Sequence, residues 1–229
     1  MTNDHHHPRI HVADGSDRGL VLDRKPSVAI RLVVAVVSGA LLGVLSRLGD
    51  GLPAGLSGLS DIGGPWLLLA FALGALGRRP MRSAALGAAS LAFAAASYYG
   101  YIELLQGGAA RVHVGSVALF WVMVGLGSGA LFGCAGQCWR SGNSWARVGA
   151  VSGLTGALVG ESLLQATQAA PQIWLVVAAE LAAGLIAPWV LFRARELTTQ
   201  ATAIGLAVAT PAGVVVTAAL SSISFHIAN

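Results

Sequence analysis

Two glutamates stand inside segments that are otherwise apolar. Glu161 lies in the run GALVGESLLQ and Glu180 lies in the run VVAAELAAG. A carboxylate is costly in hydrocarbon, so acids inside membrane helices nearly always face the interior of the bundle and mark functional sites. Paired acids in such a place can bind a cation or exchange protons. Alternatively, they link helices through hydrogen bonds, each worth roughly 1 kcal/mol.

The elements that carry these acids are expected to be antiparallel neighbouring helices, at 147–168 and 172–192, because the turn between them is short. At ~1.5 Å per residue, Glu161 lies ~21 Å from the start of its helix, and Glu180 lies ~12 Å from the start of the next. The two carboxyl groups are therefore predicted at similar depth, in the outer half of the membrane. Gln165 shares the face of Glu161, since residues four apart lie on one side of a helix.

Further polar and aromatic groups are expected at the same outer level. In the helix expected at 83–105, Tyr99 and Glu103 share one stripe near its end, and Trp121 lies in the outer half of the next helix. The predicted ligand or proton site is formed by Glu161, Glu180, Gln165, Glu103, Tyr99 and Trp121. Carboxylates there would neutralise a cationic ligand, and ring faces would add cation–π attraction. For other rings, including Trp66, Trp174 and Tyr98, the alternative is the aromatic belt at the lipid interface.

The composition is that of a membrane protein with several helical spans. Of the 229 residues, 55% are hydrophobic and 10% are charged, whereas soluble domains carry about 25% charged residues. Apolar runs of about 18 residues or more recur, which is long enough to cross ~30 Å of hydrocarbon. We predict an all-α polytopic membrane helix bundle with seven transmembrane helices. The expected spans are about 28–48, 63–78, 83–105, 114–136, 147–168, 172–192 and 201–221.

The basic residues predict the orientation of these spans. With seven spans, twelve of the 14 Lys and Arg residues fall on one side, and only Arg47 and Arg111 fall on the other. Because cytoplasmic loops are enriched in Lys and Arg, the N-terminus is predicted to be cytoplasmic and the C-terminus outside. Residues 1–27 are expected to form a disordered cytoplasmic tail, 28–222 the bundle and 223–229 a short outer tail. The expected location is a bacterial cytoplasmic membrane.

Small residues are expected at the contacts between helices. The chain holds 30 glycines, and in lipid small residues allow helix backbones to approach closely. The predicted packing positions are Gly39, Gly43, Gly129, Gly133, Gly153, Gly156 and Gly160. The matching segments SGALLG and SGALFG, which contain the first four of these, could also be remnants of an inverted repeat.

Several classes of protein are disfavoured by missing motifs. No phosphate loop, Rossmann glycine pattern or metalloprotease helix occurs, and the basic residues lie in loops and at helix ends. The histidines of the N-terminal tail and the pair Cys134 and Cys138 could hold a metal. A solvated tail and two reduced thiols are favoured instead, because two ligands do not make a zinc site. We expect no metal, no cofactor, no nucleic-acid partner and no enzyme activity.

The segment GPWLLLAFALGALGRRPMRSAALGAASLAFAAASYYGY, with SGALLGVLSRLGD before it, resembles an uncharacterised actinobacterial multi-pass membrane family. The resemblance covers about residues 38–101, and it implies no activity. The residues that carry it are Trp66, Ala70, Phe71, Gly74, Arg78, Arg79, Tyr98 and Tyr99. The architecture is also similar to the substrate-binding membrane subunits of vitamin-uptake transporters of the energy-coupling factor type. Those usually have six spans with both termini inside, so a seventh span counts against that similarity.

The leading hypothesis is an integral membrane small-molecule transporter or membrane-embedded substrate-binding subunit, for a cationic ligand or coupled to protons. Its expected surroundings are membrane lipid, with a membrane-protein partner or an ATPase module where it serves as a subunit. The second hypothesis is a non-catalytic structural or partner subunit of a larger membrane complex. The third is an enzyme that acts on a lipid-linked substrate. A cavity lined by Glu161 and Glu180 would favour the first hypothesis, and dry packing of both acids would favour the second.

Overall fold

The computed structural model describes residues 27–52, 62–106, 111–168 and 173–193, together with the single positions Ala207, Pro211 and Val215. The described residues form six helices and no strand. They are α1 (Val28–Gly49), α2 (Gly64–Ala75), α3 (Pro80–Gln106), α4 (Arg111–Ser141), α5 (Ser144–Gln168) and α6 (Trp174–Arg193). The prediction of an all-helical protein is therefore confirmed for this part of the chain.

The first six predicted helices match the observed ones, with differences at their ends. The predicted helix at 63–78 is shorter in the structure, because α2 begins at Gly64, ahead of Pro65 in its first turn, and ends at Ala75. The predicted helix at 114–136 is longer, because α4 continues to Ser141. Its last turn is held by the Ser141 hydroxyl, which donates to the Gln137 carbonyl oxygen at 3.0 Å.

Other predicted segments lie outside the described residues. These are most of the tail at 1–27, the short outer tail at 223–229, and the seventh helix at 201–221 apart from three positions. Those three positions, Ala207, Pro211 and Val215, are helical.

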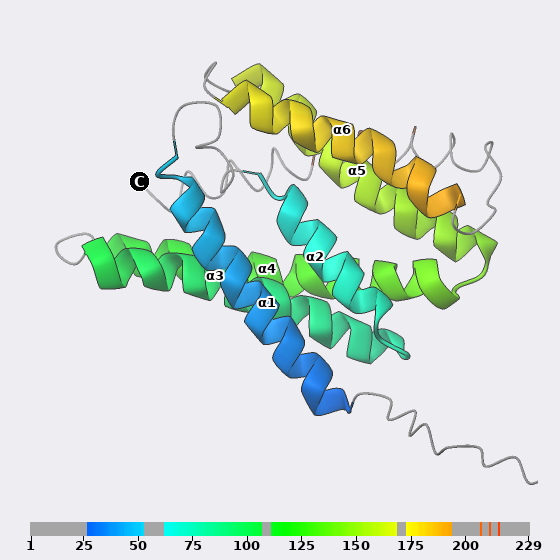
Figure 1. Cartoon of the computed structure of the whole chain (residues 1–229), viewed down its shortest axis with the longest axis horizontal. Coiled ribbons are helices and arrows are strands. Elements are labelled where there is room, and N and C mark those ends of the chain that lie inside the picture. Colours follow the sequence, from blue (N-terminus) through cyan, green and yellow to red (C-terminus); the bar gives the residue numbers. More distant parts are fainter. Residues whose placement is uncertain are drawn as a thin grey trace, which may run out of the picture.

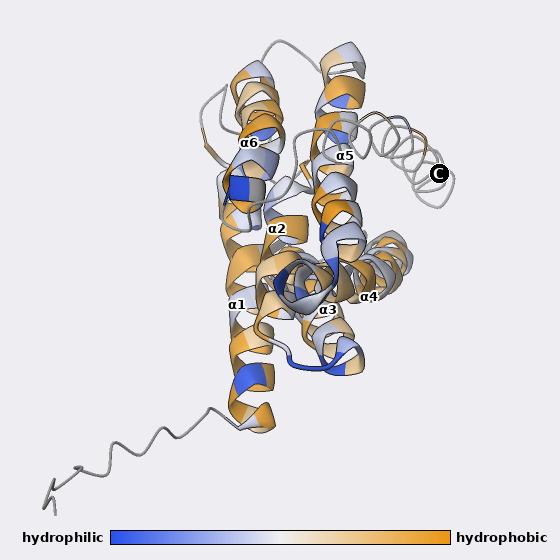
Figure 2. Ribbon diagram, turned by 90° about the vertical axis from the view of Figure 1, so that its right-hand side faces the viewer, coloured by the Kyte–Doolittle hydropathy of each residue, from blue (hydrophilic) through white to orange (hydrophobic). Residues whose placement is uncertain are grey.

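In the part of the chain that the structure describes, three helices are long and apolar enough to cross a membrane. They span Val28–Gly49, Gly115–Ser141 and Trp174–Leu191, and α2 is a shorter apolar helix. Figure 2 shows hydrophobic residues around most of α1. Large side chains on α1 are exposed, such as Val33 at 60% and Leu45 at 61%. A continuous exposed apolar surface is rare on soluble proteins, so these residues are suited to contact lipid and the protein is a membrane protein.

Helices α1, α3 and α4 are joined through glycines. On α3 and α4, Gly87 and Gly129 face each other so closely that a side chain at either position would collide with the opposite backbone. On α1, a side chain at Gly39 or Gly43 would collide with the backbone of α3, at Ser90 and Ala94 respectively. Because glycine has no Cβ atom, these three long helices can pack backbone against backbone.

Helix α2 lies between this group and the pair formed by α5 and α6 (Figure 1). On one side, Gly74 of α2 meets the backbone of α4 at Gly133. On the other side, Phe71 of α2 belongs to a buried cluster with Leu154 and Leu158 of α5. The short central helix therefore contacts both groups of long helices, which also meet directly where α4 packs against α5.

Candidate functional site

The short helix α2 has groups of opposite charge at its two ends. Its C-terminal carbonyl groups accept hydrogen bonds from two arginines. Arg31 Nη1 donates to the Leu76 oxygen, and Arg140 Nη1 donates to the Ala75 oxygen, both at 2.7 Å. Cations stabilise the negative C-terminal end of a helix dipole, and carboxylates stabilise the positive N-terminal end. The N-terminal end of α2 is where Glu161 and Glu180 lie.

Glu161 caps α2 from a different helix. The backbone N–H of Gly63, the residue before α2, donates a hydrogen bond to Glu161 Oε1 at 2.6 Å. A Cβ atom at Gly63 would lie 2.8 Å from Glu161 Oε2, which is shorter than real Cβ contacts. Glycine suits this position because a side chain here would force the end of the Glu161 side chain to shift. Glu161 therefore accepts a hydrogen bond at the start of α2. In most helices a side chain of the N-cap residue itself accepts such a bond.

Glu180 is the more deeply buried acid, with an exposed fraction of 4%. The Ser162 hydroxyl lies 3.3 Å from Glu180 Oε2, but it also donates to the Leu158 carbonyl oxygen at 2.8 Å. A hydroxyl has one proton to donate, so Glu180 shares it with a better-placed acceptor. Glu180 Oε1 lies against the backbone of Gly64. The geometry of this contact does not meet the criteria of a hydrogen bond. Among the described residues Oε1 has no hydrogen-bond partner.

The two carboxyl groups also meet each other. Glu161 contacts Gly63 and Glu180 contacts the adjacent Gly64, so the two side chains lie within hydrogen-bonding reach of each other. In the described part of the chain, no Lys, Arg or His approaches this pair. Adjacent carboxyl groups in an apolar setting can form a hydrogen bond only when one of them carries a proton. The arrangement is therefore chemically suited to hold a proton or to accept a cation.

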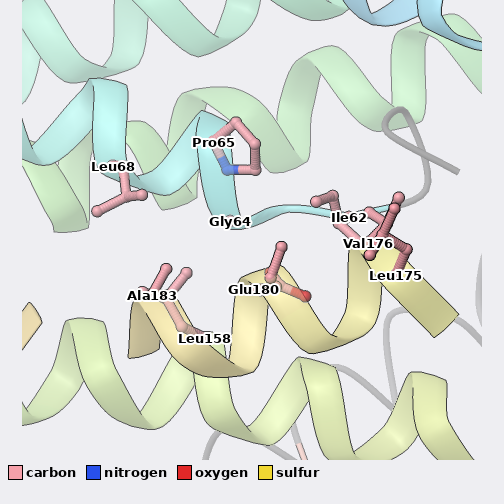
Figure 3. A pocket seen from close by; sticks show the side chains of 10 residues that line it. Ile62, Gly64, Pro65, Leu68, Leu158, Leu175, Val176, Glu180 and Ala183 are labelled. Carbon is pink, nitrogen blue, oxygen red and sulfur yellow. The ribbon is translucent and has the colours of Figure 1, made fainter. Parts of the chain in front are cut away.

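A pocket of about 250 Å³ opens beside Glu180, between the first turn of α2 and helices α5 and α6. Figure 3 shows Glu180 on the α6 wall of this pocket, across from Gly64 and Pro65. The other described lining residues are apolar or glycine: Ile62, Gly64, Pro65, Leu68, Leu158, Leu175, Val176, Ala179 and Ala183. In the described part of the chain, one buried carboxyl group thus lies on an otherwise hydrophobic wall.

One family profile covers every residue that the structure describes. A profile described as a family of unknown function, DUF6518, matches residues 23–223. The chain belongs to the DUF6518 family. The resemblance to an uncharacterised family, predicted on residues 38–101, is thereby confirmed and extended over all six helices. No curated protein and no solved structure matches the chain.

The structure brings together only part of the site that the sequence predicts for this DUF6518 protein. Glu161 and Glu180 meet, and Gln165 is half-buried one turn further along α5. Glu103 is exposed near the end of α3, and Trp121 packs edge-on against Phe120 with ring centroids 5.3 Å apart.

Tyr99 also lies elsewhere. Its ring packs edge-on against that of Tyr98, with centroids 5.0 Å apart. Neither Tyr99 nor the side chains of Glu103 and Trp121 line the pocket beside Glu180. The predicted polar and aromatic lining is therefore replaced by an aliphatic one. The reason is that a stripe on one helix shows which residues share a face but does not show which helix that face meets.

An ionic and aromatic cluster joins α1, α2 and α3 at the end where α1 finishes. Arg47 Nη1 lies 2.9 Å from Asp50 Oδ2, and the Tyr98 hydroxyl donates to the same oxygen at 2.9 Å. Trp66 packs against Tyr98 with ring centroids 6.5 Å apart. Asp50 thus holds both Arg47 of the same helix end and Tyr98 of α3.

The predicted packing glycines of DUF6518 differ in their surroundings. Gly133 lies against Ser83 of α3, as close as the contacts already described for Gly39, Gly43 and Gly129. Gly156 and Gly160 are buried. Gly153 is exposed, and a Cβ atom there would meet no atom of another residue within 4 Å. In the described part of the chain, Gly153 is therefore not a contact between helices.

Sequence reasoning overlooked Gly63, Gly64 and Ser162, which shape the surroundings of the acids. A usable signal was present in the stretch IGGPW, which interrupts an apolar region with two glycines and a proline. Short helices interrupted by Gly and Pro point to binding sites in transporters, because the exposed helix end faces the site. Ser162 carries no comparable signal, since serine is common at helix contacts in membranes.

Proposed function

We propose that this DUF6518 protein binds a small molecule at the pocket beside Glu180 and carries it across the membrane, alone or as the binding subunit of a larger transporter. The supporting observation is that Glu180, which is 4% exposed and lines an apolar pocket, has a carboxyl oxygen without a hydrogen-bond partner among the described residues. An acid used only for packing would have its hydrogen bonds satisfied. The unsatisfied oxygen therefore suits a ligand or a proton.

The pocket favours a small ligand. Its volume of about 250 Å³ lies just below the usual range of roughly 300–1,000 Å³ for ligand sites. The aliphatic walls suit a compact hydrocarbon body, and Glu180 supplies a single polar contact. A large or strongly polar substrate would leave many of its polar groups without partners.

The proposal includes seven spans in a bacterial cytoplasmic membrane, with the N-terminus cytoplasmic and the C-terminus outside. At ~1.5 Å per residue, the 12 residues of α2 extend ~18 Å, well short of ~30 Å of hydrocarbon. The C-terminal end of α2 binds Arg31 and Arg140, which suits the cytoplasmic side because Lys and Arg are enriched there. In this arrangement the N-terminal end of α2 lies within the membrane, as in the broken helices of transporters.

A ligand screen on the purified protein tests the proposal. The measurement is the thermal unfolding midpoint with a panel of small amines, carboxylic acids and neutral molecules, since a ligand that binds the folded state raises this midpoint. Ala183→Phe places a ring in the pocket, and Ala182→Phe is the matched control at an exposed neighbouring position on α6. A ligand that stabilises the native protein and Ala182→Phe, but not Ala183→Phe, supports the proposal. Equal stabilisation of both variants, or no hit in the panel, contradicts it.

A second candidate function is a structural or partner subunit, and the Gly63–Glu161 hydrogen bond favours it. That bond, at 2.6 Å, joins α5 to the start of α2 without any need for a ligand. If both acids act only as links, Glu161→Gln and Glu180→Gln should both reduce the amount of folded protein in the membrane. If Glu180 serves a ligand, Glu180→Gln should abolish binding of a screened ligand while the protein level stays close to that of the native chain.

A further inference from the structure

The carboxyl pair combines three features that together indicate a particular ligand chemistry. Glu161 and Glu180 lie within hydrogen-bonding reach of each other. Glu180 Oε1 is buried and has no hydrogen-bond partner among the described residues. Of the described residues that line the pocket, Glu180 is the one with a charged side chain. We propose that this pair holds one shared proton, and that the ligand is a small apolar ammonium ion that exchanges with it. This inference rests on the function proposed above.

The hydrogen bonds that the surrounding residues donate to the pair are consistent with one shared proton. Glu161 Oε1 receives the Gly63 N–H, and Glu180 Oε2 has only a share of the Ser162 hydroxyl. Two ionised carboxylates would repel each other here, because no cation of the described residues lies beside them. Two acids at such close range share a proton for this reason. The groups that face the pair from α2 are the backbone amides of Gly63 and Gly64, which do not titrate.

A cation fits the free oxygen better than an anion or a neutral molecule. Among the described lining residues Glu180 is the charged one, with Glu161 behind it, so an anionic ligand would meet like charge. The backbone N–H of Gly63 already donates its hydrogen bond to Glu161, so it is not available to a ligand. A neutral ligand would supply a donor but would not replace the charge of the lost proton. An ammonium ion replaces that charge, while Leu68, Leu158 and Val176 surround its hydrocarbon part.

The exchange conserves charge inside the membrane. In the resting state the pair and its proton carry a net charge of −1. When an ammonium ion binds, the proton leaves to water, and the pair and the ammonium ion again carry a net charge of −1. No covalent bond other than the O–H bond to the exchanged proton breaks or forms. Because the buried charge is the same in both states, neither requires an additional uncompensated charge in hydrocarbon.

Calorimetric titration of the full-length protein in lipid nanodiscs tests this proposal. The probe is benzyltrimethylammonium, which has no titratable proton, and the neutral control is its carbon isostere, neopentylbenzene. Titration in two buffers with different ionisation enthalpies counts the protons released. We expect about one proton released per ammonium ion bound, since the pair holds a single shared proton. The isostere should bind at least about tenfold more weakly and release none, because it lacks the charge that pairs with the carboxylates.

Variants at the pair provide the decisive controls. Glu180→Gln should weaken ammonium binding by about a hundredfold, the usual scale for removing one partner of a buried charge pair. Glu161→Gln should still bind the ion but release clearly less than one proton, because no second acid is left to share it. Glu103→Gln, at an exposed acid near the end of α3, should match the native protein in affinity and proton count.

The outcomes separate this inference from the function on which it rests. Absence of ammonium binding, or binding without proton release, overturns the exchange. If the isostere binds to the native protein but not to Ala183→Phe, the pocket remains a ligand site. In that case only the proposed cation exchange fails. If neither probe nor any molecule of the screening panel binds, both proposals fail.

Discussion

The backbone N–H of Gly63 donates a 2.6 Å hydrogen bond to Oε1 of Glu161, a residue of a different helix and 98 positions further along the chain. This contact gives the short helix α2 a cap at its N-terminal end, within the bundle. It also places the neighbouring Gly64 against Glu180. The stability of the protein and the geometry of its candidate site therefore depend on the same two glycines.

Substitution of Gly63 by alanine should destabilise the protein. The new Cβ atom would lie 2.8 Å from Glu161 Oε2, so the carboxyl group must shift, and we expect this shift to weaken or break the hydrogen bond to Oε1. A buried group left without its partner costs about 1–3 kcal/mol. The check is the thermal unfolding midpoint in detergent. Gly100→Ala is the matched control, because a Cβ atom there meets nothing within 4 Å. A midpoint for Gly63→Ala as high as that of the control would contradict the capping role.

Substitution of Gly129 by alanine should separate α3 from α4. A Cβ atom at Gly129 would collide with the backbone of Gly87, which has no side chain to rotate away. Overpacking of this kind typically costs about 1–3 kcal/mol. Gly127→Ala lies on the same helix in open space and should leave stability unchanged or slightly raised. The yield of monodisperse protein in size-exclusion chromatography and the unfolding midpoint should fall only for Gly129→Ala.

Dicyclohexylcarbodiimide should modify the carboxyl pair. This apolar reagent attacks protonated carboxyl groups, and Glu180 combines contact with a second acid with a place on an apolar pocket. Peptide mass spectrometry should find the adduct on Glu161 or Glu180 and not on the exposed Glu103. The yield should fall as the pH rises, because ionised carboxylates do not react. Modification that persists when both pair residues are changed to glutamine would show that the reagent acts elsewhere.

Cysteine labelling should show that the two ends of the bundle face opposite sides of the membrane. In a background with Cys134→Ser and Cys138→Ser, single cysteines replace Leu104, near the end of α3, and Trp145, near the start of α5. These side chains are 85% and 74% exposed, respectively. The proposed orientation predicts that a membrane-impermeant maleimide reaches Leu104→Cys in intact cells, and Trp145→Cys only after permeabilisation. The reverse pattern would invert the topology.

The sequence by itself determined the helical class and the first six helices to within a few residues. Long apolar runs satisfy their backbone hydrogen bonds within one segment as helices in lipid, and runs of about 18 residues have the length of a helical span. The sequence also predicted that Glu161 and Glu180 meet, because a short turn makes their helices antiparallel neighbours and the number of residues from that turn sets their depth. These are local properties of the chain.

Only the tertiary structure decided what surrounds the two acids. The rotation and crossing of each helix place Pro65, Leu68 and Val176 at the pocket, and leave Tyr99, Glu103 and Trp121 elsewhere. The contact between Gly63 and Glu161 likewise joins residues 98 positions apart. A helical pattern shows which residues share a face, whereas the partner of that face depends on how glycine contacts fit the helices together. That fit is a property of the whole bundle, so no single segment contains it.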